Sequence, residues 1–219
     1  MYNNFTEENF HSLCNQLASQ DNELNNIIQQ YGYPPFWNRK PGFDTLIHII
    51  LEQQVSLASA KAALEKLRNR IGIISPAALT ALTPEEMKAC YFSRQKIIYA
   101  RDLAESIISK RLNLKKLEKQ PDDVIREELK KIKGIGDWTV DVYLMMALHR
   151  SDCFPLGDIA LVKSLKDVKG LPKQTDRDEL ARLSNVWKPY RTIAAFLLWH
   201  AYLRKSGKSG KSERAEDGK

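Results

Sequence analysis

The sequence predicts an all-α protein, and three observations support this fold class. Apolar residues recur mainly with the 3.6-residue period of helices, and no run alternates strictly between apolar and polar residues. No Asn-Gly pair marks a hairpin between strands. The chain has only 10 glycines in 219 residues, which also argues against many tight β-turns. We therefore expect a core of packed helices.

Two adjacent helices are expected in the first half of the chain. Residues 43–51 form a nearly continuous apolar run that ends at the polar stretch Glu-Gln-Gln at 52–54. Ser56 follows, and its hydroxyl can accept a hydrogen bond from the first turn of a second helix with an apolar face over residues 57–67.

Three further segments carry helix signals. Residues 83–86 read Thr-Pro-Glu-Glu, which places a capping residue, a first-turn proline and two acids at the positive end of a helix. An amphipathic helix is expected over about 94–110. Residues 121–123, Pro-Asp-Asp, open a helix that leads into the central segment 129–148.

The predicted domain is single and helical, and spans residues 1–204. The helices expected at 138–148 and 190–203 are apolar on nearly every side, so both should be buried. Residues 205–219, KSGKSGKSERAEDGK, are too polar to bury enough surface to offset their chain entropy, and we expect a disordered basic tail there. The tail supplies +2 of the formal net charge of +7, which favours a polyanionic partner.

The sequence carries no signal for a secreted or membrane protein. Cys14, Cys90 and Cys153 are far apart, form no CxxC pair and are odd in number, so we expect neither a disulfide framework nor a zinc site. No apolar run reaches the roughly 20 residues of a membrane span, and the first residues lack the pattern of a signal peptide. A soluble intracellular protein is the expectation.

The segment 129–148, LKKIKGIGDWTVDVYLMMAL, reads as a helix, a glycine-containing hairpin and a second helix. The first helix should end near Lys131, and Gly134 and Gly136 permit backbone angles that residues with a Cβ rarely adopt. The N–H groups of residues 136–138 should point outward at the start of the second helix, where an anion is attracted.

The residues around these glycines strengthen the expectation of a phosphate-binding hairpin. Lys130, Lys131 and Lys133 add positive charge. The backbone carbonyls of Lys130, Ile132 and Ile135 could bind a monovalent cation, Na⁺ or K⁺, that bridges to the phosphate. The alternative is that Gly-x-Gly forms only a tight turn between two helices.

Ten residues after this segment stands a single carboxylate, Asp158 in FPLGDIALVK. A carboxylate beside a phosphate-binding hairpin points to chemistry on a nucleotide held by its backbone. The alternative is that Asp158 only caps the helix that begins with IALVK, and the two roles are compatible.

These motifs resemble a known family. IKGIGDWTVDVYLMMAL resembles the helix-hairpin-helix of the base-excision DNA glycosylase superfamily, and FPLGDIALVK resembles the loop that follows it there, with Asp158 at the place of its aspartate. In order along the chain, LEQQVSLASAKAALEKL, FSRQKIIYARDLAE and WKPYRTIAAFLLWHAY resemble segments of the DNA-3-methyladenine glycosylase II family. The resemblance covers about Phe43 to Leu203.

The resemblance implies a two-lobed helical fold with a cleft between the lobes. It also implies hydrolysis of the N-glycosidic bond of alkylated purines, such as 3-methyladenine, in double-stranded DNA, without a cofactor for catalysis. Strand-cutting relatives carry a lysine nucleophile where this chain has Trp138, so we expect a monofunctional enzyme that leaves an abasic site. No iron–sulfur cluster is expected, because no cysteine follows Cys153.

The roles carried over are one catalytic residue, a base pocket and a DNA-binding surface. Asp158 would stabilise the sugar cation or activate water. The pocket would include Trp138, Trp199 and Asp141, although core packing is an alternative for both tryptophans. Gln54 matches the residue that fills the gap left by the flipped base. The full set expected to bind DNA is Gln54, Lys133, Gly134, Ile135, Gly136, Asp137 and Thr139.

Other polar and aromatic residues are expected to be structural. Asp141 lies in an apolar helix and should either be paired, with Arg191 as the candidate, or line the pocket. Trp187 and Tyr143 are expected in the core, and His149 and His200 are expected to be partly buried without a metal.

Two other functions fit the same residues. One is a glycosylase for oxidised or mismatched bases, and the other is a non-catalytic helix-hairpin-helix module that binds DNA. Asp158 favours an enzyme over the module, because a carboxylate there would repel phosphate. We expect a monomer, cytoplasmic and nucleoid-associated in a prokaryote or nuclear in a eukaryote.

Overall fold

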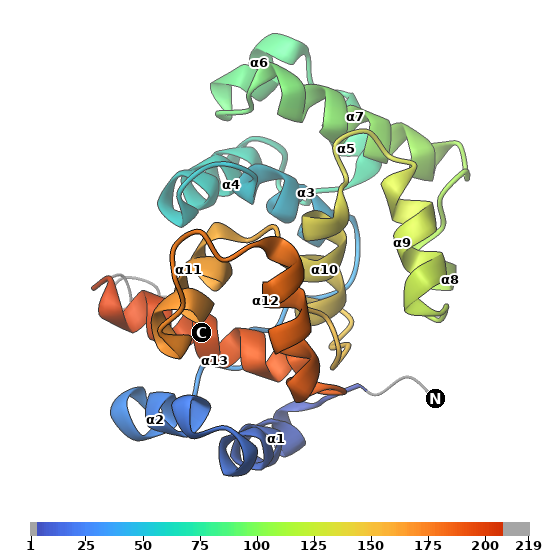
Figure 1. The fold of residues 1–219 in the computed structure, drawn as a ribbon. Coiled ribbons are helices and arrows are strands. Elements are labelled where there is room, and N and C mark those ends of the chain that lie inside the picture. The colour runs from blue at the N-terminus through green and yellow to red at the C-terminus, as the bar shows by residue number, and fades with distance from the viewer. Residues whose placement is uncertain (1–3, 208–219) are drawn as a thin grey trace. The chain divides into compact units, whose positions relative to one another are not determined.

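The computed structural model describes residues 4–207, and its elements are helices (Figure 1). Within this range no strand forms, and the pair Asn4 and Arg150 makes an isolated bridge. The all-α prediction is confirmed. The helices are α1 (Glu7–Gln20), α2 (Asn22–Tyr31), α3 (Phe43–Glu52), α4 (Leu57–Ile71), α5 (Pro76–Thr80), α6 (Pro84–Ala89), α7 (Arg94–Ile108), α8 (Leu114–Leu117), α9 (Asp122–Lys130), α10 (Asp137–Met146), α11 (Ile159–Lys169), α12 (Arg177–Ser184), the 3₁₀ helix η1 (Asn185–Trp187) and α13 (Arg191–Lys205).

The chain divides into two compact units. One combines the residues up to Trp37 with those from His149 onward, and the other runs from Asn38 to Leu148. We call them the discontinuous unit and the central unit. Most of the tail predicted over 205–219 lies outside the described residues, because the described chain ends at residue 207.

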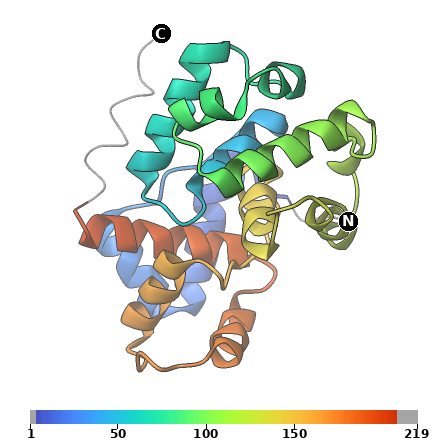
Figure 2. The ribbon, with the colours of Figure 1, turned by 90° about the horizontal axis from the view of Figure 1, so that it is seen from above.

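Helix α13 is the core of the discontinuous unit. It packs against α1, α2 and α11, and Figure 2 shows it beside α11. Ten consecutive side chains of α13, from Thr192 to Ala201, are buried. This burial explains why the segment is apolar on nearly every side, and it confirms the prediction made for residues 190–203.

A buried polar cluster connects distant parts of the same unit. Asp21 caps α2 by accepting the Leu24 N–H at 3.1 Å. Its other oxygen, Oδ2, accepts hydrogen bonds from Trp187 Nε1 at 2.8 Å and from Lys169 Nζ at 2.7 Å. Trp187 is only 2% exposed, so its predicted structural role is confirmed. A carboxylate at this depth is tolerated because all three donors point at it.

Helix α3 occupies the equivalent central position in the second unit. It packs against α4, α7 and α10, and seven of its residues are buried. Tyr143 of α10 is 1% exposed, and its hydroxyl accepts the Gly42 N–H at 3.2 Å, just before α3 begins. Tyr143 is therefore structural, as predicted.

The predicted helix starts hold to within one residue. Ser56 caps α4 by accepting the Ser59 N–H, and Thr83 and Glu86 form a reciprocal capping box at the start of α6. Helix α10 departs more at its other end, because it stops at Met146 and not at residue 148. Apolar character continues past the end of the helix, since Ala147 and Leu148 are still buried.

Candidate active site and DNA-binding hairpin

The hairpin between α9 and α10 lies in the central unit, and two buried isoleucines hold it. Ile132 and Ile135 are 5% and 4% exposed, and the Ile135 N–H donates to the Ile132 carbonyl at 3.1 Å. This hydrogen bond closes the turn within four residues, so the connection between α9 and α10 is short. The two buried isoleucine side chains anchor the hairpin in the core, and the backbone of residues 136–138 begins the next helix.

The two glycines of the hairpin have different physical roles. Gly134 has a φ of +78°, and a Cβ at this position would collide with the Tyr99 ring. Gly136 has a φ of −106° and a ψ of −175°, which any residue adopts, and a Cβ there would meet nothing within 4 Å. The expectation that both glycines supply unusual angles is thus correct for Gly134 and wrong for Gly136. At Gly136 the absence of a side chain only leaves the surface open.

Helix α10 begins directly after Gly136, with no side-chain cap on its first turn. The first N–H groups of any helix lie outside the intrahelical hydrogen-bond ladder, and they carry the positive end of its dipole. Asp137 stands in this turn, and its Oδ1 accepts a hydrogen bond from Lys130 Nζ at 2.8 Å. Arg126 lies 3.9 Å from the same oxygen. These two cations offset the negative charge of Asp137 beside the turn.

The side chains predicted to bind DNA contribute unequally to this surface. Lys133 is exposed, but its backbone N–H donates to Asp102 Oδ2 at 2.8 Å, so its ammonium remains the group that can meet a phosphate. Thr139 is 2% exposed, and any contact with DNA would come from its backbone. Trp138 is half-buried in the first turn of α10. The Ile132 carbonyl already accepts one N–H, and it keeps one lone pair for the expected cation, with the carbonyls of Lys130 and Ile135.

Gln53, for which the sequence predicted no role, binds the hairpin. Its side-chain amide donates to the Gly134 carbonyl and to Thr139 Oγ1, each at 2.9 Å. The next residue, Gln54, is exposed and has a φ of +56° at the end of α3. The candidate gap-filling residue therefore stands beside a residue attached to the hairpin. No local signal in Glu-Gln-Gln distinguishes the two glutamines.

Asp141 pairs with a different arginine from the one predicted. It is 7% exposed and forms an ion pair with Arg126 of α9, whereas Arg191 binds Asp152 through its Nε at 2.7 Å. Arg126 and Asp141 are equidistant in sequence from the centre of the hairpin, so the folded-back helices bring them together. That symmetry was a usable signal in the sequence. The pair accounts for the burial of the carboxylate, and the predicted place of Asp141 in the base pocket stays a prediction.

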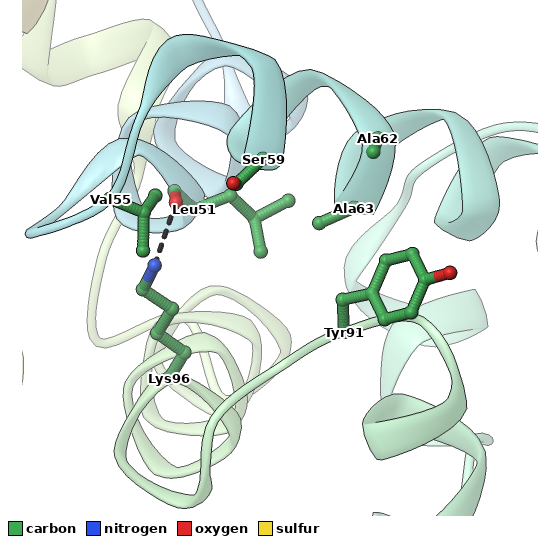
Figure 3. A pocket seen from close by; sticks show the side chains of 7 residues that line it. All are labelled: Leu51, Val55, Ser59, Ala62, Ala63, Tyr91 and Lys96. Atoms are coloured by element: carbon green, nitrogen blue, oxygen red, sulfur yellow. Dashed lines mark hydrogen bonds between the residues drawn. The ribbon is translucent and has the colours of Figure 1, made fainter.

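Beside the end of α3 is a hollow of about 360 Å³ (Figure 3). Lys96 reaches into it from α7 and donates to the Leu51 carbonyl at 2.7 Å. Burial lowers the pKa of Lys96. Tyr91 faces the hollow from the opposite side, and Lys66 Nζ lies 4.2 Å from the centre of its ring.

Asp158 lies in the discontinuous unit, at the start of α11. Its Oδ1 accepts the Leu161 N–H at 2.8 Å, which makes Asp158 the cap of that helix. The same oxygen accepts a hydrogen bond from Trp199 Nε1 at 3.0 Å. The capping role is confirmed, and the carboxylate is held from two directions.

Trp199 is buried next to this carboxylate. It is 9% exposed, and its ring stacks on Phe196 with centroids 5.9 Å apart. Trp37 meets it edge-on at 6.2 Å. The indole N–H points at Asp158, so the structure joins two of the predicted site residues within one unit. The hairpin, Trp138 and Asp141 belong to the central unit.

Residues 4–207, which the structure describes, contain no group of three or more histidine, cysteine, aspartate or glutamate side chains that could hold a metal ion. None of their helices is long and apolar enough to cross a membrane. Cys14, Cys90 and Cys153 are buried free thiols.

Comparison with known proteins decides the family. The model of the HhH-GPD superfamily base excision DNA repair proteins matches residues 47–189, which include the hairpin and Asp158. The chain belongs to this superfamily. The resemblance predicted from the hairpin and the aspartate loop is confirmed.

Relatives and solved structures agree with this membership. DNA-3-methyladenine glycosylase 1 of Schizosaccharomyces pombe is 30% identical over 190 residues, which cover 84% of this chain and 83% of that protein. The structure of S. pombe 3-methyladenine DNA glycosylase Mag1 in complex with abasic DNA matches with a TM-score of 0.78 and 27% identity, over 86% of this chain and 95% of that one. An 8-oxoguanine glycosylase/lyase of Clostridium acetobutylicum has the same fold, with a TM-score of 0.77 and 16% identity over 93% of this chain and 77% of that one.

Proposed function

We propose that this protein is a monofunctional DNA glycosylase that releases alkylated purines from double-stranded DNA. The observation that carries the proposal is the Asp158 carboxylate, whose Oδ1 receives hydrogen bonds from both the Leu161 N–H and the Trp199 indole. The bond to Leu161 is explained by capping of α11, whereas the second donor, the Trp199 indole, fixes the carboxylate beyond what a cap in a module that only binds DNA requires. The 30% identical relative is a DNA-3-methyladenine glycosylase by name, which supports an alkylated purine as the substrate.

In this proposal Asp158 acts at the sugar. When the bond from the base nitrogen to C1′ breaks, its electron pair leaves with the base and C1′ gains positive charge. A carboxylate nearby stabilises that charge. A water oxygen then bonds to C1′, and its proton passes to Asp158 or to solvent. An alkylated purine already carries positive charge, so it departs as a neutral base and needs little protonation.

The hairpin binds the DNA backbone. The first turn of α10 offers N–H groups and the helix dipole to a phosphate, and Gly136 leaves room for the phosphate to approach. Lys133 and the backbone of Gly134, Ile135, Asp137 and Thr139 border the same turn. Backbone contacts carry no sequence information, so the grip suits a lesion that occurs in any sequence.

Trp138 and Trp199 take different roles in this proposal. Trp138 is half-buried and can stack on a cationic base. It also replaces the lysine that a strand-cutting mechanism needs. Trp199 is a positioning residue for Asp158, because its N–H is directed at the carboxylate and its ring is packed against Phe196. No cofactor takes part, and the protein acts as a monomer.

The fold alone does not choose the base, since an 8-oxoguanine glycosylase/lyase shares it at 16% identity. Excision assays on duplexes that contain 3-methyladenine, 7-methylguanine or 8-oxoguanine would identify the substrate. We expect release of the methylated purines. Release of 8-oxoguanine alone would contradict the proposed substrate class.

The catalytic proposal is tested with Asp158→Asn on methylated duplex DNA. Asparagine keeps the size of the side chain and can still cap α11 with its amide oxygen, but it lacks the charge. We expect excision to fall by about 100-fold or more, with binding to an abasic-site duplex retained. Full excision by the variant would show that Asp158 is only a helix cap.

A further inference from the structure

We propose that Gln53 is a positioning residue that couples the gap-filling turn at Gln54 to the phosphate-binding hairpin. The inference rests on the proposed function, because it concerns how the same protein holds damaged DNA. It assigns a role to a residue whose side-chain amide is bound to the hairpin.

The first support is the position of the Gln53 amide. Its nitrogen donates to the Gly134 carbonyl and to Thr139 Oγ1, both at 2.9 Å, across 81 and 86 residues of sequence. Gly134 is in the hairpin, and Thr139 is in the first turn of α10. One amide therefore joins both sides of the phosphate-binding turn to the end of α3.

The second support is that the backbone before Gln54, at the end of α3, is held as well. Lys96 Nζ donates to the Leu51 carbonyl at 2.7 Å, which places a cation at the negative end of the α3 dipole (Figure 3). Gln54 then has a φ of +56°, an angle that a residue with a side chain adopts only when its surroundings hold it. Lys96 and Gln53 hold the backbone on either side of residue 52.

The consequence is energetic coupling within the central unit. A phosphate seated on α10 orders the hairpin, and the hairpin orders Gln53, so Gln54 is presented to the gap in the duplex. Conversely, seating Gln54 stabilises the hairpin. Two such contacts should be non-additive, because residues joined by one hydrogen-bond network are not independent.

The test is a set of double-mutant cycles on binding to a duplex with a tetrahydrofuran abasic site. Gln54→Gly removes the gap-filling side chain at a backbone angle that glycine adopts without strain. Gly136→Asp places a repulsive carboxylate at the phosphate turn, where the backbone angle is ordinary and the space is open. In the wild-type background, we expect the double variant to lose at least about 5-fold less affinity than the product of the two single losses.

The cycle is then repeated with Gln53→Met, which keeps the length of the side chain and removes both donors. We expect the two losses to become multiplicative within about 2-fold. Thr139→Val tests the same connection from the other side if Gln53→Met folds poorly, and it should reduce the non-additivity. Thr139→Ser keeps the acceptor and should preserve it. A residue that only stabilises the fold would lower all affinities without changing the coupling.

The outcomes separate this inference from the proposed function. Multiplicative losses in the wild-type background would overturn the inference alone, as would non-additivity that survives both Gln53→Met and Thr139→Val. Failure of the wild-type protein to release a methylated purine would overturn the proposed function, whereas equal binding of abasic and undamaged duplexes by that protein would overturn the inference.

Discussion

The hairpin and the Asp158 site are built in different ways. The turn of the hairpin closes locally: the Ile135 N–H donates to the Ile132 carbonyl, and the flanking helices are adjacent in the sequence, although Gln53 and Asp102 also bind the turn from distant segments. The Asp158 site depends on Trp199, which is 41 residues away on another helix. A local motif presents backbone N–H groups that any phosphate can use, whereas a distant partner sets the direction of one side chain. Substitutions in the hairpin should therefore weaken DNA binding, and substitutions around Asp158 should slow catalysis, each without the other effect.

The largest expected effect is a loss of stability on substitution of Gly134. Gly134→Ala should lower the free energy of unfolding by about 3 kcal/mol, because the φ of +78° disfavours alanine and its Cβ would collide with Tyr99. Gly136→Ala should change it by less than about 1 kcal/mol. Urea unfolding of both variants measures the difference.

The two glycine variants also test whether the hairpin binds phosphate. Gly136→Ala should weaken binding to every duplex while the protein stays folded, because the added methyl group stands where a phosphate approaches. Equal stability losses at the two glycines would contradict the different roles described above.

The second effect concerns Trp199. Trp199→Phe keeps an aromatic ring in the cluster and removes the donor to Asp158, and we expect kcat to fall by about 10-fold with unchanged affinity for an abasic duplex. Single-turnover excision and fluorescence anisotropy measure the two quantities.

Trp37→Phe is the matched control, because Trp37 packs against the edge of Trp199 and is separate from the bonds to Asp158. It should leave excision unchanged. If both variants lost activity equally, packing of the aromatic cluster and not the bond to Asp158 would be responsible.

The smallest expected effect is a difference between the two units in stability at acidic pH. Burial raises the pKa of Asp21, but hydrogen bonds from Lys169, Trp187 and Leu24, with the Lys169 charge, outweigh burial and leave the pKa below its ordinary value. A lowered folded-state pKa contributes stability above the ordinary aspartate value of about 3.9, and this stability is lost as the pH falls through the folded value.

Hydrogen exchange between pH 5 and pH 3 would detect this loss. Amides of α2 should lose about 1 kcal/mol of protection relative to those of α3, and Asp21→Asn should abolish the difference. If the amides of α2 and α3 lost protection equally in the wild-type protein, Asp21 would not determine the acid stability of its unit.

Several elements could be predicted from the sequence because their causes are local. Ser56 and the Thr-Pro-Glu-Glu stretch at 83–86 cap helices through bonds to residues three positions away. The hairpin was recognisable from its glycines and lysines. Asp158 could be identified as a cap from its place before α11, and as a candidate catalytic residue from its place after the hairpin and its resemblance to the family's aspartate loop.

Other features could not be predicted because their partners are distant. The pattern did not distinguish Gln53 from Gln54, since only the packing of α3 against α10 shows which one reaches the hairpin. Asp141 is a different case: the sequence prediction paired it with Arg191, but Arg126 is only 15 residues away and the fold-back about the hairpin made that pairing predictable. Trp199 could be placed near the site, but the direction of its indole N–H was not predictable.

The sequence by itself determined the helices, the glycine-containing hairpin and the position of a carboxylate after it, because periodicity, capping and backbone freedom act over a few residues. Only the tertiary structure decided which side chains hold Asp158, which glutamine is attached to the hairpin, and which of the two glycines requires an unusual backbone angle. These outcomes depend on atoms that come together from distant segments, and a side chain carries no local record of the partner it will meet.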